Sequence, residues 1–170
     1  MAMHVGLIGG IGPAAAEFYY RGLIDRHTRA GTVPHLTITH ADARQMTENL
    51  ARRDAPAQAR IFATLIRRLK AAGAQVVAIT SMGGHFCIRE TEAVSVLPII
   101  STIPAVNQSL QRMKATRIGL LGARTIMESS LYGGITTTAQ IVPPQGQDLE
   151  RIHQNYVDMA IAGRVAGNQR

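Results

Sequence analysis

The residues whose types and spacing could do chemistry lie in one short stretch, Ser81-Met82-Gly83-Gly84-His85. A run of apolar, strand-favouring residues, Val76 to Thr80, comes before it, and a helical pattern begins near His85. Strand-to-helix turns of this kind are where open α/β sheets place their ligand sites. A serine hydroxyl becomes a useful base only when a neighbour takes its proton, and His85 is the candidate. The stretch predicts an acid–base site at Ser81 and His85, although a histidine in a first helical turn also serves as a cap or a solvent contact.

The elements that must position this stretch alternate along the chain. We expect strands at residues 4–8, 35–39, 76–80 and 97–100. We expect one helix that begins at Pro13 and further helices at residues 56–72, 88–94, 105–113 and 149–162. Pro13 suits the first position of a helix because its missing N–H has no partner there. The alternation predicts an α/β fold with a mainly parallel sheet and helices on both faces.

A second cycle resembles the first. The segment from Val5 to Gly10, VGLIGG, is similar to the segment from Ile118 to Ala123, IGLLGA, and an offset of 113 residues also aligns Tyr19 with Tyr132. We interpret the chain as two pseudo-duplicated parallel-sheet lobes, residues 1–115 and 116–170. The second lobe is expected to be incomplete, because the counterpart of Ser81 would lie 113 residues further on, beyond Arg170.

Composition excludes several classes of protein. Of the 170 residues 46% are hydrophobic, enough for a real core, yet no run of eighteen apolar residues suggests a membrane span, so we expect no membrane partner and a cytoplasmic location. The single cysteine, Cys87, can form neither an internal disulfide nor a thiolate metal site, and no metal is expected. It lies six residues after Ser81 and is expected to be a buried free thiol.

The charge and the lysine content limit which partners and cofactors are expected. The net charge is +7, but basic residues never run beyond pairs such as Arg52-Arg53 and Arg67-Arg68, so no nucleic-acid partner is expected. Lys70 and Lys114 are the only lysines, and neither is placed to form a Schiff base in a cleft, which predicts no pyridoxal phosphate and no other cofactor. The first glycine-rich loop lacks the dinucleotide-binding spacing, so a nucleotide-binding module is a minor alternative.

Three segments resemble the aspartate/glutamate racemase family of cofactor-independent amino-acid racemases. Gly9-Gly10-Ile11-Gly12-Pro13 is similar to the family's GGMGP opening, AGAQVVAITSMGGH (residues 72–85) to its AGAD-strand-CNTAH element, and IGLLGARTIMESSLY (residues 118–132) to its second-lobe opening. The resemblance covers essentially the whole chain. It implies two α/β lobes, often in a homodimer, with a small acidic amino acid, aspartate or glutamate, held between them.

The family chemistry gives these positions a role. Inversion of an α-carbon needs one group to remove the proton from one face and another to deliver a proton to the opposite face. Most members use two cysteines for this, one from each lobe. In this chain Ser81 stands at the first cysteine's position, and the second would lie near position 194, which is 113 residues after Ser81.

The resemblance also assigns substrate-contacting positions. They are Ile11, His40, Met82, Gly83 and Thr125. Met82 and Gly83 replace the family's Asn and Thr, so backbone N–H groups would hold the substrate there. His40 follows the second strand, and a surface position for it, with Asp42 as a helix cap, is an equal alternative. The sequence predicts a PLP-independent amino-acid racemase in a homo-oligomer, or else a catalytically inactive relative that serves as a binding or assembly protein.

Overall fold

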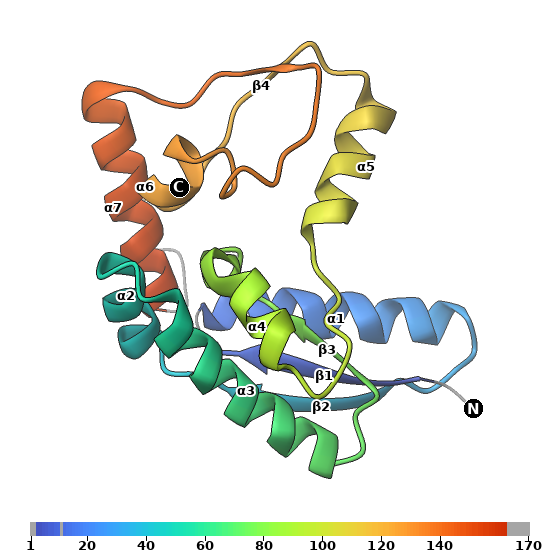
Figure 1. Cartoon of the computed structure of the whole chain (residues 1–170). Coiled ribbons are helices and arrows are strands. Elements are labelled where there is room, and N and C mark those ends of the chain that lie inside the picture. The colour runs from blue at the N-terminus through green and yellow to red at the C-terminus, as the bar shows by residue number, and fades with distance from the viewer. Residues whose placement is uncertain (1–2, 11, 163–170) are drawn as a thin grey trace. The chain divides into compact units, whose positions relative to one another are not determined.

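The computed structural model describes residues 3–10 and 12–162, and the chain divides into two compact units, residues 1–100 and 101–170 (Figure 1). The first unit contains β1 (His4–Gly9), α1 (Pro13–Arg29), β2 (His35–His40), α2 (Ala43–Ala51), α3 (Ala55–Ala71), β3 (Val76–Ile79), the 3₁₀ helix η1 (Gly83–Cys87) and α4 (Ile88–Val94). The second unit contains α5 (Ile103–Met113), β4 (Arg117–Ile118), α6 (Arg124–Glu128), β5 (Gln140–Ile141) and α7 (Gly146–Ala162).

The sheet of the first unit is parallel, with the strand order β2-β1-β3. β1 is the central strand, and its glycines let helices approach both of its faces. A Cβ atom added at Gly6 would lie 2.9 Å from Leu69 Cδ1 of α3, and one added at Gly9 would lie 2.9 Å from Ala16 Cβ of α1. Because residues three apart in a strand face opposite sides, α3 and α1 cover opposite faces of the sheet. The expected α/β fold with a parallel sheet is confirmed.

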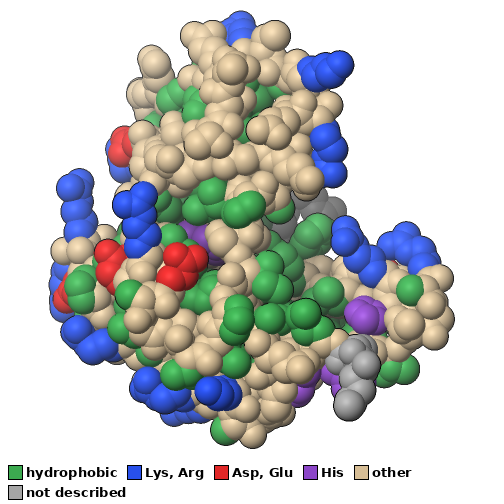
Figure 2. All heavy atoms as spheres, turned by 45° about the vertical axis from the view of Figure 1, so that its right-hand side comes forward, with side chains coloured by type: hydrophobic (Ala, Val, Ile, Leu, Met, Phe, Trp, Pro, Cys, Tyr) green, Lys and Arg blue, Asp and Glu red, His purple; other side chains and the backbone are tan. Residues whose placement is uncertain are grey.

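The two faces are covered unequally. On the α3 side Phe62, Ile66 and Leu69 are buried against the sheet, whereas α1 contributes no buried residue. On the α1 side Phe18 is 76% exposed and Ile38 of β2 is 48% exposed, and hydrophobic side chains reach the surface in Figure 2. The core of the first unit therefore lies between the sheet and α3.

Local sequence explains where the helices begin. Asp42 and Asp54 cap α2 and α3, since Asp42 Oδ1 accepts from Arg44 N at 2.8 Å and Asp54 Oδ1 accepts from Ala57 N at 2.9 Å. α1 begins with Pro13 after Gly12 and has no side-chain cap. The sequence placed a helix after Asp42 only as one of two interpretations and gave it no bounds, because the polar composition of α2 hides the buried face that Met46 and Asn49 provide.

The strand expected at residues 97–100 is reduced to one bridge between Val77 and Ile99. Val77 N donates to Pro98 O at 3.0 Å and Ile100 N donates to Val77 O at 2.8 Å. Pro98 has no N–H with which to extend the pairing, which explains why no ladder forms.

The second unit holds a parallel sheet of two short strands, in which Ile118 pairs with Ile141. Pro143 and Pro144 follow β5 and cannot donate to a ladder, so the pairing ends two residues after it begins. The strand expected over residues 118–123 is correspondingly short. Tyr132, which the offset aligned with Tyr19 of α1, lies in a turn of left-handed residues rather than in a helix.

The boundary between the units differs from the expected lobes 1–115 and 116–170, because α5 belongs to the second unit. Asn107 of α5 explains this: its Nδ2 donates to Gly134 O at 2.9 Å, and its Oδ1 accepts from Thr136 N at 2.9 Å. Gly134 also packs tightly, since a Cβ there would lie 3.0 Å from Ile103 Cδ1. The duplication of two lobes stays a prediction.

Candidate active site

The carboxyl ends of the three parallel strands meet at one edge of the first unit's sheet. Backbone bonds join them there: Thr80 N donates to Ile8 O at 3.1 Å, and Ala41 N donates to Gly9 O at 2.8 Å. The hydroxyl of Thr80 donates to the same Ile8 oxygen at 3.0 Å. The turns that follow β1, β2 and β3 therefore lie at the same edge, which carries Gly10, His40 and Ser81.

Gly10 allows the first two turns to touch. Its φ angle is +95°, and a Cβ atom added there would lie 2.4 Å from Ala41 O and 2.8 Å from His40 Cε1. The ring of His40 thus lies over Gly10, although His40 as a whole is exposed. Asp42 caps α2, as one of the two sequence interpretations held. Ile11, the predicted contact in the first turn, lies outside the described residues.

Ser81 and His85 come together in the turn after β3, and both are buried. His85 Nδ1 lies 2.8 Å from the backbone carbonyl oxygen of Ser81. A carbonyl oxygen only accepts, so Nδ1 is the donor and, in the neutral ring, Nε2 is the acceptor nitrogen. This bond fixes the ring through the Ser81 backbone. The expected pairing of His85 with Ser81 is thus made through the carbonyl, not through the hydroxyl.

The surroundings keep His85 neutral. Burial lowers the pKa of His85 below its ordinary value, and this outweighs the bond to Ser81 and the negative charge of Glu92, which both raise it. A neutral imidazole at neutral pH can accept a proton. The turn therefore carries both the Ser81 hydroxyl and a neutral imidazole, which the structure joins through the Ser81 carbonyl.

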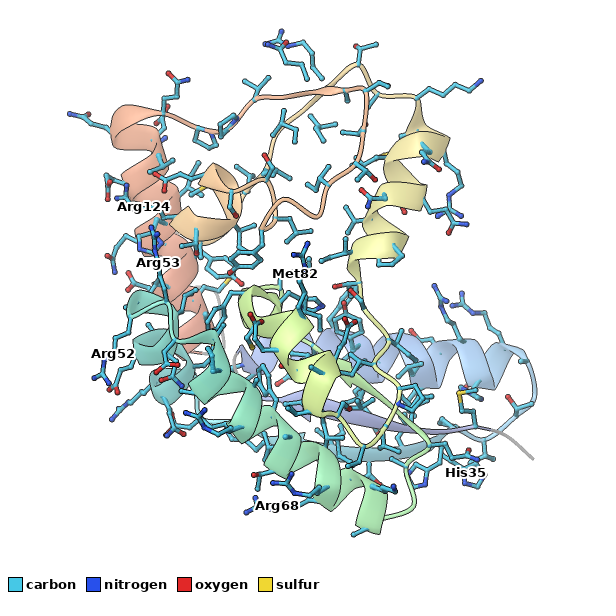
Figure 3. The ribbon with its side chains drawn as sticks, in the orientation of Figure 1. His35, Arg52, Arg53, Arg68, Met82 and Arg124 are labelled. Atoms are coloured by element: carbon cyan, nitrogen blue, oxygen red, sulfur yellow. The ribbon has the colours of Figure 1, made fainter. Side chains whose placement is uncertain are left out.

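Gly83 leaves the Ser81 hydroxyl close to the backbone. A Cβ atom added at Gly83 would lie 3.4 Å from Ser81 Oγ and 3.7 Å from Met46 Cε. Met46, on α2, thus lies near the same turn, and sequence reasoning did not single it out. Its side chain is buried and gives this part of the turn an apolar neighbour. Met82, labelled in Figure 3, is half-buried in the same turn.

Cys87 is the buried free thiol that the sequence predicted. Burial raises its pKa to about 11, and its Sγ lies 3.4 Å from Gly84 O and 3.5 Å from Thr91 Oγ1. A thiol with this pKa carries almost no thiolate at neutral pH, so Cys87 does not replace the family's cysteines.

Thr125, the predicted contact from the second lobe, lies in α6 of the second unit. Its carbonyl oxygen accepts from Ser129 N at 3.1 Å and from the Ser129 hydroxyl. The following residues Ser130, Leu131 and Tyr132 have φ angles of 50°, 60° and 54°. Such a run of left-handed, non-glycine residues is unusual and places strain beside Thr125.

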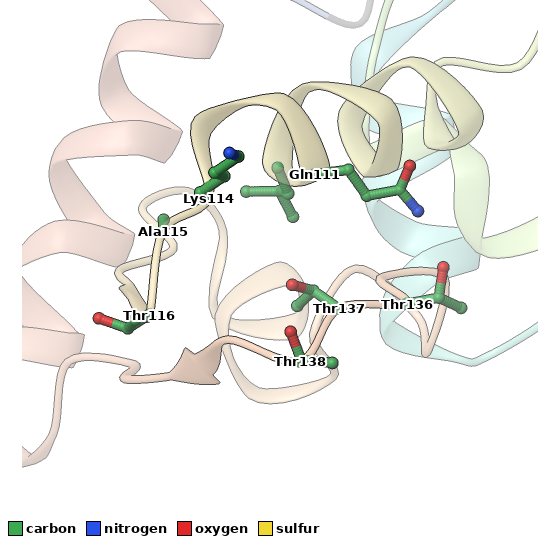
Figure 4. A pocket seen from close by; sticks show the side chains of 8 residues that line it. Gln111, Lys114, Ala115, Thr116, Thr136, Thr137 and Thr138 are labelled. Carbon is green, nitrogen blue, oxygen red and sulfur yellow. The ribbon is translucent and has the colours of Figure 1, made fainter.

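Two pockets lie in the second unit. One, of about 760 Å³, is lined by α5 and the segment of threonines at 136–138 (Figure 4); the other, of about 460 Å³, lies around Arg124 and Pro143. None of the predicted site residues lines either pocket. In residues 3–10 and 12–162, no group of three or more His, Cys, Asp or Glu side chains is placed to hold a metal ion. No helix in this part of the chain is long and apolar enough to cross a membrane.

Comparison with known proteins identifies the family. The Asp/Glu/Hydantoin racemase family model matches residues 8–161, so the chain belongs to that family. Among solved structures it is similar to a candidate Asp/Glu racemase from Yersinia pestis, with a TM-score of 0.78 and 24% identity over 99% of this chain and 76% of that one.

Two archaeal structures are also similar. An aspartate racemase homologue from Pyrococcus horikoshii OT3 has a TM-score of 0.72 and 20% identity, over 95% of this chain and 73% of that one. The aspartate racemase of Picrophilus torridus has a TM-score of 0.65 and 17% identity, over 95% and 71%. At these identities the likeness shows the fold alone. No curated protein matches the chain.

Proposed function

We propose that the chain binds a small acidic amino acid, aspartate or glutamate, and transfers its α-proton as a cofactor-independent racemase does, with Ser81 as the acid–base group on one face. The observation that carries this proposal is the position of Ser81, at the sheet edge that also carries Gly10 and His40. Membership of the racemase family supports the reaction class.

In this proposal the first unit supplies the proton transfer and the backbone contacts. Met82 and Gly83 lie in the turn after Ser81, next to the place proposed for the substrate, and His40 lies at the neighbouring turn. Ser81 removes the α-proton after its own proton passes to a base, and neutral His85 is the base proposed. Because Nδ1 is bonded to the Ser81 carbonyl, the proton would be accepted at Nε2.

Inversion also needs a proton donor on the opposite face of the α-carbon. The chain has one cysteine, and its raised pKa and burial disqualify it. Thr125 is the second-unit residue that we propose to contact substrate. Complete racemisation by this chain alone is therefore expected to be slow, whereas exchange of the α-proton on one face needs only Ser81 and the base that takes its proton.

The alternative is a protein that binds the amino acid without turning it over. The geometry of His85 favours this alternative, because its observed bond to Ser81 goes to the carbonyl and leaves the hydroxyl an ordinary, weak base. Both functions share the same binding site, so the test must separate binding from exchange and exchange from inversion.

The test incubates each enantiomer of aspartate and glutamate with the protein in deuterated water. Proton NMR measures α-deuterium, chiral chromatography measures inversion, and calorimetry measures binding. Deuterium without inversion, lost in Ser81→Ala and kept in the surface variant Ser109→Ala, supports one-face transfer. Binding without deuterium supports the alternative. Absence of binding to both amino acids overturns the proposal.

We also propose that the chain is a cytoplasmic homo-oligomer. The exposed Phe18 and Ile38 on the thinly covered α1 side provide apolar surface that self-association would bury. Light scattering that reports a monomer at every accessible concentration would refute the oligomer.

A further inference from the structure

The charged side chains on the exposed side of α3 are all positive. Arg60, Arg67, Arg68 and Lys70 are all exposed, whereas the opposite side of this helix is buried in the core. The helix sequence APAQARIFATLIRRLKA contains no acidic residue. We call these four side chains the basic face of α3.

The helix gathers charges that look dispersed in the sequence. At about 100° per residue, positions 60, 67, 68 and 70 fall within an arc of about 160°. Arg67 is additionally held on this face, since its Nη2 donates to Thr64 Oγ1 at 2.9 Å. Figure 2 shows Lys and Arg side chains along the lower left margin, on the side of α3, and Figure 3 shows Arg68 pointing outward from the helix.

Among the described residues, no cation of this face forms an ion pair, although α4, which packs against α3, carries the exposed Glu90 and Glu92. The ion pairs of the described residues involve Arg52, Arg124 and Arg151. Asp54, the nearest acidic residue in sequence, is used as the cap of α3. The preceding connection adds the exposed Arg53, whereas Arg52 is paired with Glu48.

We propose that the basic face of α3 binds the phosphate backbone of a single-stranded nucleic acid. Three of its four cations are arginines, whose planar guanidinium groups match phosphate oxygens in pairs. Arg60 and Arg67 are about 10 Å apart along the helix axis, at about 1.5 Å per residue, so they reach separate phosphates. The interaction is a function separate from the amino-acid site.

The same face argues against other partners. α3 has no large hydrophobic side chain among its exposed residues, so it cannot insert into a lipid surface. Its one aromatic residue, Phe62, is fully buried and cannot stack on a base, so binding is independent of nucleotide sequence. The sequence expectation of no nucleic-acid partner rested on the absence of long basic runs, on the few aromatic residues and on the lack of a binding motif. The helix supplies the clustering of charge that long basic runs would provide.

The test is fluorescence anisotropy with a fluorescein-labelled 20-nucleotide single-stranded RNA at 50 and 200 mM salt. Four phosphate contacts predict a loss of affinity of about 50-fold over this range, from a slope of about −0.7 per contact. In the variant Arg60→Gln/Arg67→Gln/Arg68→Gln one phosphate contact remains, so the affinity should fall only about threefold between 50 and 200 mM salt. The control Arg21→Gln/Arg26→Gln/Arg29→Gln removes the same charge from α1. Circular dichroism checks that both variants are folded.

Retention of the 50-fold salt dependence in the α1 variant and its loss in the α3 variant support the proposal. Equal losses in the two variants overturn it, because general charge would then explain binding. Absence of binding at 50 mM salt also overturns it. Displacement of the RNA by polyglutamate at matched charge concentration would overturn it in favour of an acidic protein partner.

Discussion

Replacement of Gly10 by alanine tests how closely the turns at the candidate site approach each other. The backbone at Gly10 has φ +95°, which an alanine adopts only with strain, and the new Cβ would lie 2.4 Å from Ala41 O. Strain at such a residue costs about 1–3 kcal/mol, and forced overpacking costs a similar amount. We expect Gly10→Ala to lower the free energy of unfolding by about 2–4 kcal/mol.

Gly12→Ala is the matched control, two residues away in the same loop. A Cβ at Gly12 would meet no atom within 4 Å, and its φ of 176° is extended backbone that alanine adopts freely. Urea denaturation followed by circular dichroism measures both variants, and with a slope of about 2 kcal/mol per M the Gly10 variant should unfold about 1–2 M earlier. Equal midpoints for the two variants would refute the close approach of the first two turns.

Three further predictions concern buried polar groups of the first unit. Asn49 Nδ2 donates to Gln58 Oε1 at 2.9 Å in the interior, so Asn49→Ala should cost about 1–3 kcal/mol, and Asn49→Leu/Gln58→Leu should recover most of it in urea denaturation; a double variant as unstable as the single one would contradict this. Burial raises the pKa of Cys87 from 9.0 to about 11, so this thiol should react slowly with a thiol reagent at pH 8. The same shift should stabilise the fold below pH 9, and this stabilisation should be lost between about pH 9 and 11. An equal loss of stability over this pH range in Cys87→Ala would contradict the assignment to Cys87. His85, whose pKa is lowered by burial, should favour folding above pH 6.5 and lose that stability as the pH falls through its folded pKa; an NMR titration midpoint at or above 6.5 would disprove it.

The first unit was largely predictable from the sequence, because β1 and β3 are apolar runs followed by a glycine or a hydroxyl residue, and β2 alternates Leu36 and Ile38 with threonines. β1, β2 and β3 each lie within one residue of the expected ends, and the site turn at Ser81 could be placed on that basis. Helix α2 carries few apolar residues, so the sequence offered only its cap, Asp42, as one of two interpretations and not its extent. Met46 could not be assigned to the site without that helix.

The second unit was less predictable, because its shape depends on contacts that no local pattern encodes. Asn107 joins α5 to a loop 27 residues later, a contact that the internal repeat, from which the lobe bounds were predicted, does not indicate. The bond of His85 to the Ser81 carbonyl is similarly invisible in sequence, since spacing alone cannot say which oxygen an imidazole contacts. Burial of Cys87 could be predicted, because it follows from the residue type and its place beyond the turn.

Because the two faces of the first unit's sheet are covered unequally, the helices on them should differ in how often they open locally. α1 buries no residue and has no side-chain cap, so it can detach while the contacts of α3 with β1 and β3 stay intact. Amide hydrogens of α1 should therefore exchange through small local openings, and those of α3 only through opening of the whole unit. The loop that leads from β1 into α1 contains Gly10, so each detachment would also loosen the turn over which His40 lies. The rate at which a ligand reaches that edge would then be limited by the local opening of α1.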